Sequence, residues 1–230
     1  QGQSHFLSSL TLGPDGKLYV HMGDGFDASK AQDLTSFRGK VLRMELDGSP
    51  AADNPFYDGA NGISATDYVF SYGLRNPFGG AWRDLDSRCY EVENGPSRDR
   101  MAFLAAGKNL GWNGNNSSMS THAIYNWQPA HAPVNIAFVQ PGRFGGSGFP
   151  LQKMQHAFVT ESGPTYAKGA NALGKRIVEF EIDGAGAVVS GPTKLVEYAG
   201  AGRATAVGLA AGPDGLYFTD LYKDAGYVTP

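Results

Sequence analysis

The feature that most constrains the fold is a short unit that occurs near both ends of the chain. Near the start, the apolar run 7–12 leads into Gly13-Pro14-Asp15-Gly16 and a second apolar run. Near the end, the run 207–211 leads into Gly212-Pro213-Asp214-Gly215 and again into an apolar run. Proline presets φ within a β-turn and glycine supplies positive φ, so each copy predicts two strands joined by a tight turn. A unit that recurs along a chain indicates a repeat architecture.

Further strands are predicted after these hairpins. The stretches 39–46 and 175–182 alternate apolar with polar residues and end at Asp-Gly turns, and 193–198 adds another such run. Period two with turn residues at the ends indicates half-buried strands. The 230 residues include 32 Gly and 13 Pro, and only 18% are charged, which suits a turn-rich all-β fold. Many short strands separated by Pro-Asp-Gly turns favour a β-propeller over a β-sandwich.

The sequence predicts a single β-propeller domain over 1–230 with one irregular segment. The stretch 113–150 is rich in Asn, Ser, Gly and Pro, so we expect a long excursion between two blades there. The remaining strands suffice for about four blades. Because a partial propeller leaves sheet edges and core uncovered, we expect a fragment of a longer chain, or completion of the ring by a partner subunit.

Charge and cysteine content narrow the class of partner. The net charge of −3 argues against binding to nucleic acid or to an anionic membrane. Cys89 is the single cysteine, which excludes an intrachain disulfide, and its apolar surroundings in the sequence predict a buried thiol. No apolar run approaches the roughly 20 residues of a membrane span. The chain opens at Gln1 without a signal peptide, as a mature or excised segment would.

Three short runs place polar or glycine residues where extended segments stop. They are Gly73-Leu74-Arg75-Asn76-Pro77, Glu93-Asn94-Gly95-Pro96 and Gly107-Lys108-Asn109-Leu110-Gly111-Trp112. In this order along the chain, they resemble the glucose/sorbosone dehydrogenase family. The resemblance implies a six-bladed β-propeller of the soluble quinoprotein type, of which this chain supplies part. It also implies oxidation of a sugar with the cofactors pyrroloquinoline quinone (PQQ) and Ca²⁺.

The resemblance assigns three residues to catalysis. His5 precedes the first strand where the family has its catalytic base, and Asp24 follows the second strand where the family has the carboxylate that orients this base. A carboxylate that binds one imidazole nitrogen fixes the tautomer and leaves the other nitrogen to accept a proton. Arg75 matches the family's arginine beside the quinone, and a guanidinium suits quinone and carboxylate oxygens.

The resemblance also implies the residues that bind the cofactors. Arg75 and Asn76 would contact PQQ, and Lys168 and Arg203 are the candidates for its late-blade cationic partners, on a looser alignment. Asn94, Gly95 and Pro96 match the turn whose oxygens bind Ca²⁺, a hard cation. Arg100 and Met101 stand where the family carries carboxylates, so a second, structural calcium site is expected to be absent. His21, His122, His131 and His156 are given no functional role.

The leading hypothesis is a PQQ- and Ca²⁺-dependent dehydrogenase that oxidises an aldose at its anomeric carbon and passes electrons to an external acceptor. Its expected location is periplasmic or extracellular. The alternative is a non-catalytic propeller module of a larger exported protein that has lost cofactor contacts, because one fold hosts both kinds of function. A Ca²⁺-dependent lactonase-type hydrolase is a third possibility, but it requires an axial set of metal ligands that the sequence does not display.

Overall fold

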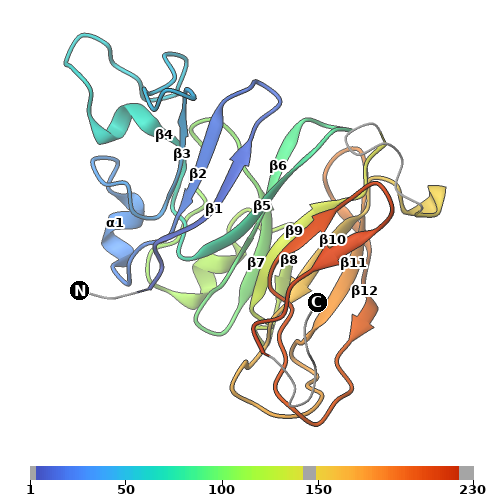
Figure 1. Cartoon of the computed structure of the whole chain (residues 1–230). Helices are drawn as coiled ribbons and strands as arrows, with labels where there is room; N and C mark the ends of the chain where they lie inside the picture. The colour runs from blue at the N-terminus through green and yellow to red at the C-terminus, as the bar shows by residue number, and fades with distance from the viewer. Residues whose placement is uncertain (1–3, 142–148, 223–230) are drawn as a thin grey trace.

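The computed structural model describes residues 4–141 and 149–222, and its regular structure is mostly β-sheet (Figure 1). Within these ranges, three four-stranded antiparallel sheets and one two-stranded sheet follow one another along the chain. The first sheet contains β1 (Leu7–Leu12), β2 (Leu18–Met22), β3 (Lys40–Met44) and β4 (Val69–Tyr72). The second contains β5 (Pro77–Arg83), β6 (Arg88–Glu93), β7 (Asp99–Phe103) and β8 (Tyr125–Trp127). The third contains β9 (Pro133–Phe138), β10 (Ala157–Glu161), β11 (Arg176–Ile182) and β12 (Val188–Glu197), and the last pairs β13 (Leu209–Ala211) with β14 (Leu216–Phe218).

The helical elements are short and lie in the connections. The described ranges contain α1 (Ala28–Gln32) and the 3₁₀ turns η1 (Ala65–Tyr68), η2 (Asn116–Ser120) and η3 (Leu151–Lys153). None of these is long or apolar enough to cross a membrane.

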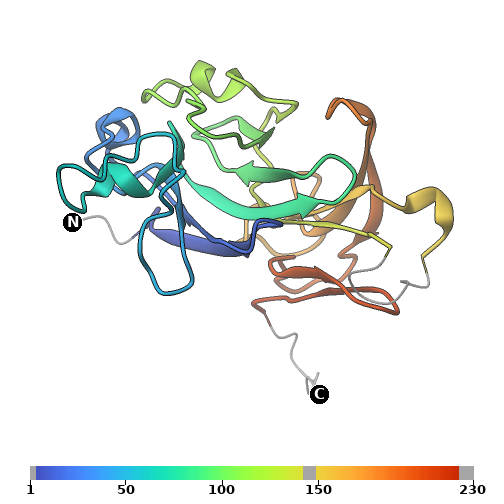
Figure 2. The same ribbon diagram turned by 90° about the horizontal axis from the view of Figure 1, so that it is seen from above.

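The sheets are arranged as the blades of a β-propeller. Each four-stranded sheet is a meander, and the first strands of successive sheets contact one another: β1 with β5, β5 with β9 and β9 with β13. Figure 2 shows the sheets following one another in chain order around the region where these strands meet. The predicted all-β propeller fold is therefore confirmed, and residues 4–141 and 149–222 supply three blades and the first hairpin of a fourth.

The two Gly-Pro-Asp-Gly turns form hairpins as predicted. Gly13 N–H donates to Lys17 O at 2.9 Å, and Gly16 has the positive φ of 73° that the turn requires. At the other end of the chain, Gly212 N–H donates to Gly215 O at 2.8 Å. These turns fix the registers of β1 with β2 and of β13 with β14.

Apolar side chains fill the spaces between blades. Tyr19 and Val41 of the first blade pack with Cys89, Ala102 and other residues of the second blade and its loops. A larger cluster joins the second and third blades. Burial of each large apolar side chain contributes roughly 1.5–3 kcal/mol. Cys89 lies in this core, as predicted, and burial raises the pKa of its thiol.

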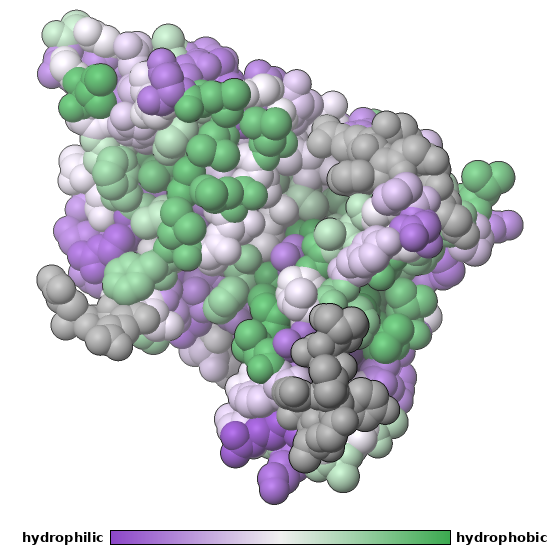
Figure 3. Space-filling model, viewed as in Figure 1, coloured by the Kyte–Doolittle hydropathy of each residue, from purple (hydrophilic) through white to green (hydrophobic). Residues whose placement is uncertain are grey.

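The opposite face of the first blade is not covered by any of the residues that the structure describes. Leu7, Leu10 and Leu12 of β1 are 55%, 56% and 55% exposed. Figure 3 shows apolar side chains gathered over this part of the molecule. Clusters of buried apolar side chains join neighbouring blades elsewhere, so this face has the character of a blade interface that lacks its neighbour.

The stretch 113–150 does not form the single excursion that its composition predicted. It contains η2, then β8, which is the outer strand of the second blade, and then β9, which is the inner strand of the third. Residues 142–148 of the stretch lie outside the described residues. The strands were missed because β8 is only three residues long and β9 begins with the polar and turn-forming residues of Pro133-Val134-Asn135. Both strands nevertheless bury large side chains, including Trp127, Ile136 and Phe138.

Candidate functional site

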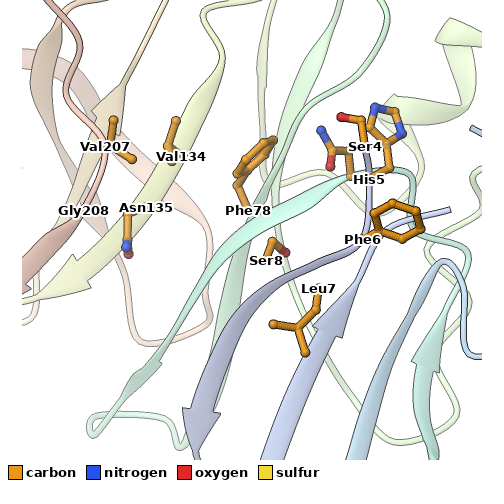
Figure 4. Close-up of a pocket in the computed structure, with 11 residues that line it drawn as sticks. Ser4, His5, Phe6, Leu7, Ser8, Phe78, Val134, Asn135, Val207 and Gly208 are labelled. Atoms are coloured by element: carbon orange, nitrogen blue, oxygen red, sulfur yellow. The ribbon is translucent and has the colours of Figure 1, made fainter. Parts of the chain in front are cut away.

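The starts of the four innermost strands gather around one cleft of about 520 Å³. Residues from before and within β1, from the start of β5, from β9 and from just before β13 line it: Ser4, His5, Phe6, Leu7, Ser8, Asn76, Phe78, Val134, Asn135, Val207 and Gly208. Figure 4 shows the labelled lining residues on neighbouring strands. Because second strands run antiparallel to first strands, the loops after β2, β6 and β10 lie at this same end of the blades.

His5 and Asp24 form a buried pair at this cleft. His5 Nδ1 lies 2.7 Å from Asp24 Oδ1, and the side chains are only 6% and 3% exposed. The pair forms because Leu7 is opposite Met22 in the β1–β2 register, so the residues flanking these strand ends meet. The Phe26 ring packs against the imidazole with a centroid separation of 3.9 Å.

A glycine makes this close approach of two loops possible. Gly23 N–H donates to Phe6 O at 3.0 Å and Gly25 N–H donates to His5 O at 3.1 Å. A Cβ atom on Gly23 would lie 2.4 Å from His5 O, so a larger residue would push His5 away. His5 itself has φ of 60°, in the left-handed region that is uncommon for residues other than glycine.

Asp24 is held in its charged form by three donors. Oδ1 accepts from Phe26 N–H at 2.9 Å as well as from His5, and Oδ2 accepts from Trp112 Nε1 at 2.8 Å. Burial acts to raise the pKa of Asp24, but these hydrogen bonds outweigh it and hold the pKa below its ordinary value. An ionised Asp24 accepts a hydrogen bond from His5 Nδ1–H, which leaves Nε2 with its lone pair.

Arg75 joins this pair to the next loop. Its carbonyl oxygen accepts from Asp24 N–H at 2.7 Å, and its Nη1 donates to Asn94 O at 2.8 Å. The guanidinium carbon lies 5.7 Å from the centroid of the Trp112 ring. Trp112 therefore contacts both Asp24 and Arg75, the two other residues predicted to act with His5.

The positive charge of the Arg75 guanidinium is not neutralised by an ion pair with any of the described residues, so it can interact with a ligand. Burial lowers the pKa of Arg75, while the charges of Asp24, Glu93 and Asp99 oppose the shift. Among the residues that the structure describes, no carboxylate lies within ion-pair distance of it. Asn76, the next residue, lines the cleft beside His5.

A buried ion pair beneath Arg75 fixes the loop that carries it. Glu93 accepts from the backbone N–H groups of Arg75 and Asn76, and its Oε2 lies 2.6 Å from Arg100 Nε. The Arg100 guanidinium also donates to carbonyl groups of three separate loops: those of Gly73, Leu110 and Thr121. Arg100 thus ties together the loops that surround the site.

The turn Asn94-Gly95-Pro96 is tightly constrained. Asn94 N–H donates to Asn76 O at 3.0 Å, and Asn94 Nδ2 donates to Pro133 O at 2.7 Å. A Cβ atom on Gly95 would lie 1.9 Å from Arg98 O, so only glycine fits there.

The free oxygens of this turn suit a hard cation. In the described part of the chain, Asn94 Oδ1 and the carbonyl oxygens of Gly95 and Pro96 accept no hydrogen bond. Asn94 O is already used by Arg75. Amide and carbonyl oxygens are ligands that Ca²⁺ accepts in proteins, so the donor set fits the predicted metal.

Two of the predicted cofactor residues lie apart from the cleft. Lys168 and Arg203 are both exposed, and neither is among the described residues that line it. The guanidinium of Arg203 lies 5.9 Å from the centroid of the Tyr222 ring. Val207 and Gly208, a few residues after Arg203, do reach the cleft. The roles of Lys168 and Arg203 stay a prediction.

Sequence reasoning missed several residues at this end of the blades. Phe78 and Asn135 line the cleft, and Asp99 and His131 lie beside the Asn94 turn. Phe78 and Asn135 occupy the second and third positions of inner strands, which is a signal that the strand boundaries could have supplied. His131 and Asp99 have no such signal, because their neighbours come from distant parts of the chain.

Comparison with known proteins identifies the family. Residues 1–149 match the family model described as Glucose / Sorbosone dehydrogenase. The chain belongs to this family. It is 34% identical over 110 residues to the aldose sugar dehydrogenase YliI of Escherichia coli, a match covering 47% of this chain and 29% of that protein. It is 32% identical over 130 residues to quinoprotein glucose dehydrogenase B of Acinetobacter calcoaceticus, covering 48% of this chain and 26% of that protein.

The fold agrees with a solved member. The PQQ-bound aldose sugar dehydrogenase of Streptomyces coelicolor superimposes with a TM-score of 0.67 at 27% identity, over 93% of this chain and 55% of that one. Our 230-residue chain therefore spans little more than half the length of the Streptomyces coelicolor enzyme. The chain thus spans less than a third of the length of the two curated relatives, which are named as a sugar dehydrogenase and a quinoprotein.

Proposed function

We propose that the chain carries the catalytic face of a PQQ- and Ca²⁺-dependent dehydrogenase that oxidises an aldose at its anomeric carbon. The observation that carries this proposal is the His5–Asp24 pair at the cleft, with 2.7 Å between Nδ1 and Oδ1. The pair lies beside an arginine that has no carboxylate partner among the described residues. A base and a cationic group side by side are what oxidation of a sugar hydroxyl requires.

His5 acts as the base. Asp24 accepts a hydrogen bond from Nδ1–H, so Nε2 can remove the proton of the anomeric hydroxyl. Trp112 and the Phe26 N–H keep Asp24 ionised and oriented. The imidazolium that forms is stabilised by the adjacent carboxylate, which lowers the barrier for the proton transfer.

Arg75 and Asn76 would hold PQQ, a planar molecule with several carboxylates, through their guanidinium and amide groups. When bound, PQQ would take the hydride of the anomeric carbon and pass the electrons to an external acceptor. Oxygens of Asn94, Gly95 and Pro96 would hold the Ca²⁺ ion. Lys168 and Arg203 are the further candidates for cofactor binding. Lys168 lies in the loop between β10 and β11 of the third blade, and Arg203 lies before β13 of the partial fourth blade.

The exposed leucines of β1 support completion by further blades. Leu7, Leu10 and Leu12 form an apolar face on a strand whose other side is packed against the second blade. We propose that in the complete protein this face is covered by blades from a longer chain or from a partner subunit. We also propose a periplasmic or extracellular location, on the basis of the family.

The test is a titration of the purified chain with PQQ and Ca²⁺, followed by addition of glucose and other aldoses. Saturable binding, followed by loss of the oxidised-quinone absorbance when sugar is added, is the expected result. Binding without reduction, or no saturable binding, would contradict the proposed function for this chain. Either result would favour the alternative, a propeller module that has kept the scaffold without the chemistry.

A further inference from the structure

The indole of Trp112 lies between the two halves of the candidate site. Its Nε1 donates to Asp24 Oδ2 at 2.8 Å, and the guanidinium carbon of Arg75 lies 5.7 Å from the centroid of its ring. Trp112 is almost completely buried, with 3% of its surface exposed. One rigid ring thus contacts both the carboxylate that binds His5 and the cation proposed to bind the cofactor.

Hydrogen bonds to the backbone of Trp112 fix the position of this ring. Trp112 N–H donates to Gly73 O at 2.9 Å, and Trp112 O accepts from Gln32 Nε2 at 2.9 Å. The Gln32 side chain also exchanges two hydrogen bonds with the side chain of Asn109, of 3.1 and 2.8 Å. Asn109 Oδ1 accepts in turn from Gly111 N–H at 2.8 Å. These contacts hold the loop 107–112 against α1 and against the loop that carries Arg75.

The indole N–H gives Asp24 a donor that its other neighbours do not replace. His5 Nδ1 and Phe26 N–H both bind Oδ1, whereas the indole binds Oδ2. Without the indole donor, Oδ2 would be buried with no hydrogen-bond partner among the described residues. Hydrogen bonds to both oxygens fix the plane of the carboxylate, and a fixed carboxylate fixes the orientation of the imidazole that it binds. The direction in which His5 Nε2 points therefore depends on Trp112.

The face of the same ring restricts Arg75. The guanidinium packs over the indole and donates from Nη1 to Asn94 O at 2.8 Å. Tryptophan is the aromatic side chain that attracts a cation most strongly. The Arg75 carbonyl oxygen also accepts from Asp24 N–H at 2.7 Å. A displacement of the ring would therefore move Arg75 and Asp24 together.

We infer that Trp112 is a positioning residue that couples the base to the cation of the cofactor site. Its N–H orients Asp24 and thereby His5, and its ring face orients Arg75. The inference rests on the proposed function for the roles of His5 and Arg75. It assigns separate effects to two parts of one side chain: the N–H governs the rate of proton removal, and the ring face governs the affinity for an anionic quinone.

The first measurement is independent of activity. The carboxyl carbon of Asp24 is titrated by ¹³C NMR in the chain without PQQ or Ca²⁺. Trp112→Phe keeps an aromatic ring against Arg75 and removes the donor to Asp24 Oδ2. Because hydrogen bonds hold the pKa of Asp24 below its ordinary value against the effect of burial, the loss of one should move the titration midpoint to higher pH.

Trp127→Phe is the matched control. Trp127 is also buried, and its Nε1 donates at 2.6 Å to Glu161, a carboxylate that binds the imidazole of His131. This variant loses the same kind of hydrogen bond at a histidine–carboxylate pair outside the cleft. It should leave the titration midpoint of Asp24 and the rate of quinone reduction as they are in the unmodified chain.

The second measurement separates the N–H from the ring face. In single-turnover reduction of bound PQQ by glucose, Trp112→Phe should lower the rate about ten- to a hundredfold, because the base is misoriented. Its affinity for PQQ should change about threefold or less, because a ring still faces Arg75. Trp112→Leu also removes the ring and should weaken PQQ binding about three- to tenfold. If Trp112→Leu does not fold, Trp112→Phe still tests the N–H.

An unmoved Asp24 midpoint in Trp112→Phe would overturn the inference, as would an equal shift in Trp127→Phe. A shifted midpoint, in a protein whose unmodified chain does not reduce PQQ, would contradict the proposed dehydrogenase and leave the orientation of Asp24 by Trp112 standing. Reduction of PQQ at the same rate by the unmodified chain and by Trp112→Phe would have the opposite meaning. The two proposals therefore fail in distinguishable ways.

Discussion

Two histidine–carboxylate pairs on the first and second blades contain the same chemical groups but have different roles. His5 pairs with Asp24 at the cleft, and His21 pairs through Nδ1 with Glu91 between the blades. The His21 side chain is completely buried, and its Nε2 lies 3.2 Å from Thr11 Oγ1. Both nitrogens of His21 are therefore used within the protein, whereas His5 keeps Nε2 for a ligand. Access to the second nitrogen distinguishes a candidate base from a structural histidine.

The pKa values of the two carboxylates, Asp24 and Glu91, are shifted in opposite directions. Hydrogen bonds from His5, Trp112 and a backbone N–H outweigh burial and hold the pKa of Asp24 below its ordinary value. Burial dominates for Glu91 and raises its pKa, although the charge and hydrogen bond of His21 oppose the shift. Glu91 Oε1 is buried without a hydrogen-bond partner. Hydrogen bonds therefore stabilise the charged form of Asp24, whereas they do not offset the burial of Glu91.

Removal of the buried Glu91 carboxylate should lower stability more than its replacement by an amide of the same shape. Glu91→Ala leaves His21 buried without its partner and opens a cavity, so we expect it to lower the free energy of unfolding by about 3–5 kcal/mol. Glu91→Gln keeps the shape and should cost about 1 kcal/mol. Urea denaturation of both variants measures the difference. Equal losses in the two variants would show that the pair is not what holds this interface.

The pH dependence of stability should have opposite signs at the two sites. The folded-state pKa of Asp24 is depressed, so its contribution is present above the unfolded pKa of about 3.9 and is lost as pH falls through the folded pKa. The folded-state pKa of Glu91 is raised, so its contribution is present below the unfolded pKa of about 4.3 and is lost as pH rises through the folded pKa.

Asp24→Asn and Glu91→Gln isolate these contributions. Between pH 3 and pH 7, the unmodified chain should gain stability relative to Asp24→Asn and lose stability relative to Glu91→Gln. Denaturation midpoints across this range provide the measurement. Slopes of the same sign would refute the contrast between the two carboxylates.

The fold could be predicted where local chemistry decides it. The Gly-Pro-Asp-Gly turns specify hairpins by themselves, and the family resemblance was enough to place His5 beside Asp24. The segment containing β8 and β9 could not be predicted, because short strands with polar starts gain their structure from the neighbouring blades. The position of Trp112 against Asp24 depends on a contact between residues 88 positions apart, which no local pattern encodes.

The same limit applies to the carboxylate partners of the other histidines. His21 and His131 stand in ordinary strand and loop sequences, and only the folded chain brings Glu91 and Glu161 to them. Buried polar groups that are paired across blades carry no mark in the sequence around either partner.

We propose that His5, and not another paired histidine, is the base of a sugar dehydrogenase. The direct measurement is the single-turnover rate at which glucose reduces PQQ bound to the chain, compared between His5→Gln and His21→Gln variants that bind PQQ normally. We predict a fall of about 10²- to 10⁴-fold in His5→Gln, as expected for loss of a general base, and a nearly unchanged rate in His21→Gln. An unchanged rate in His5→Gln, or an equal fall in both variants, would contradict it.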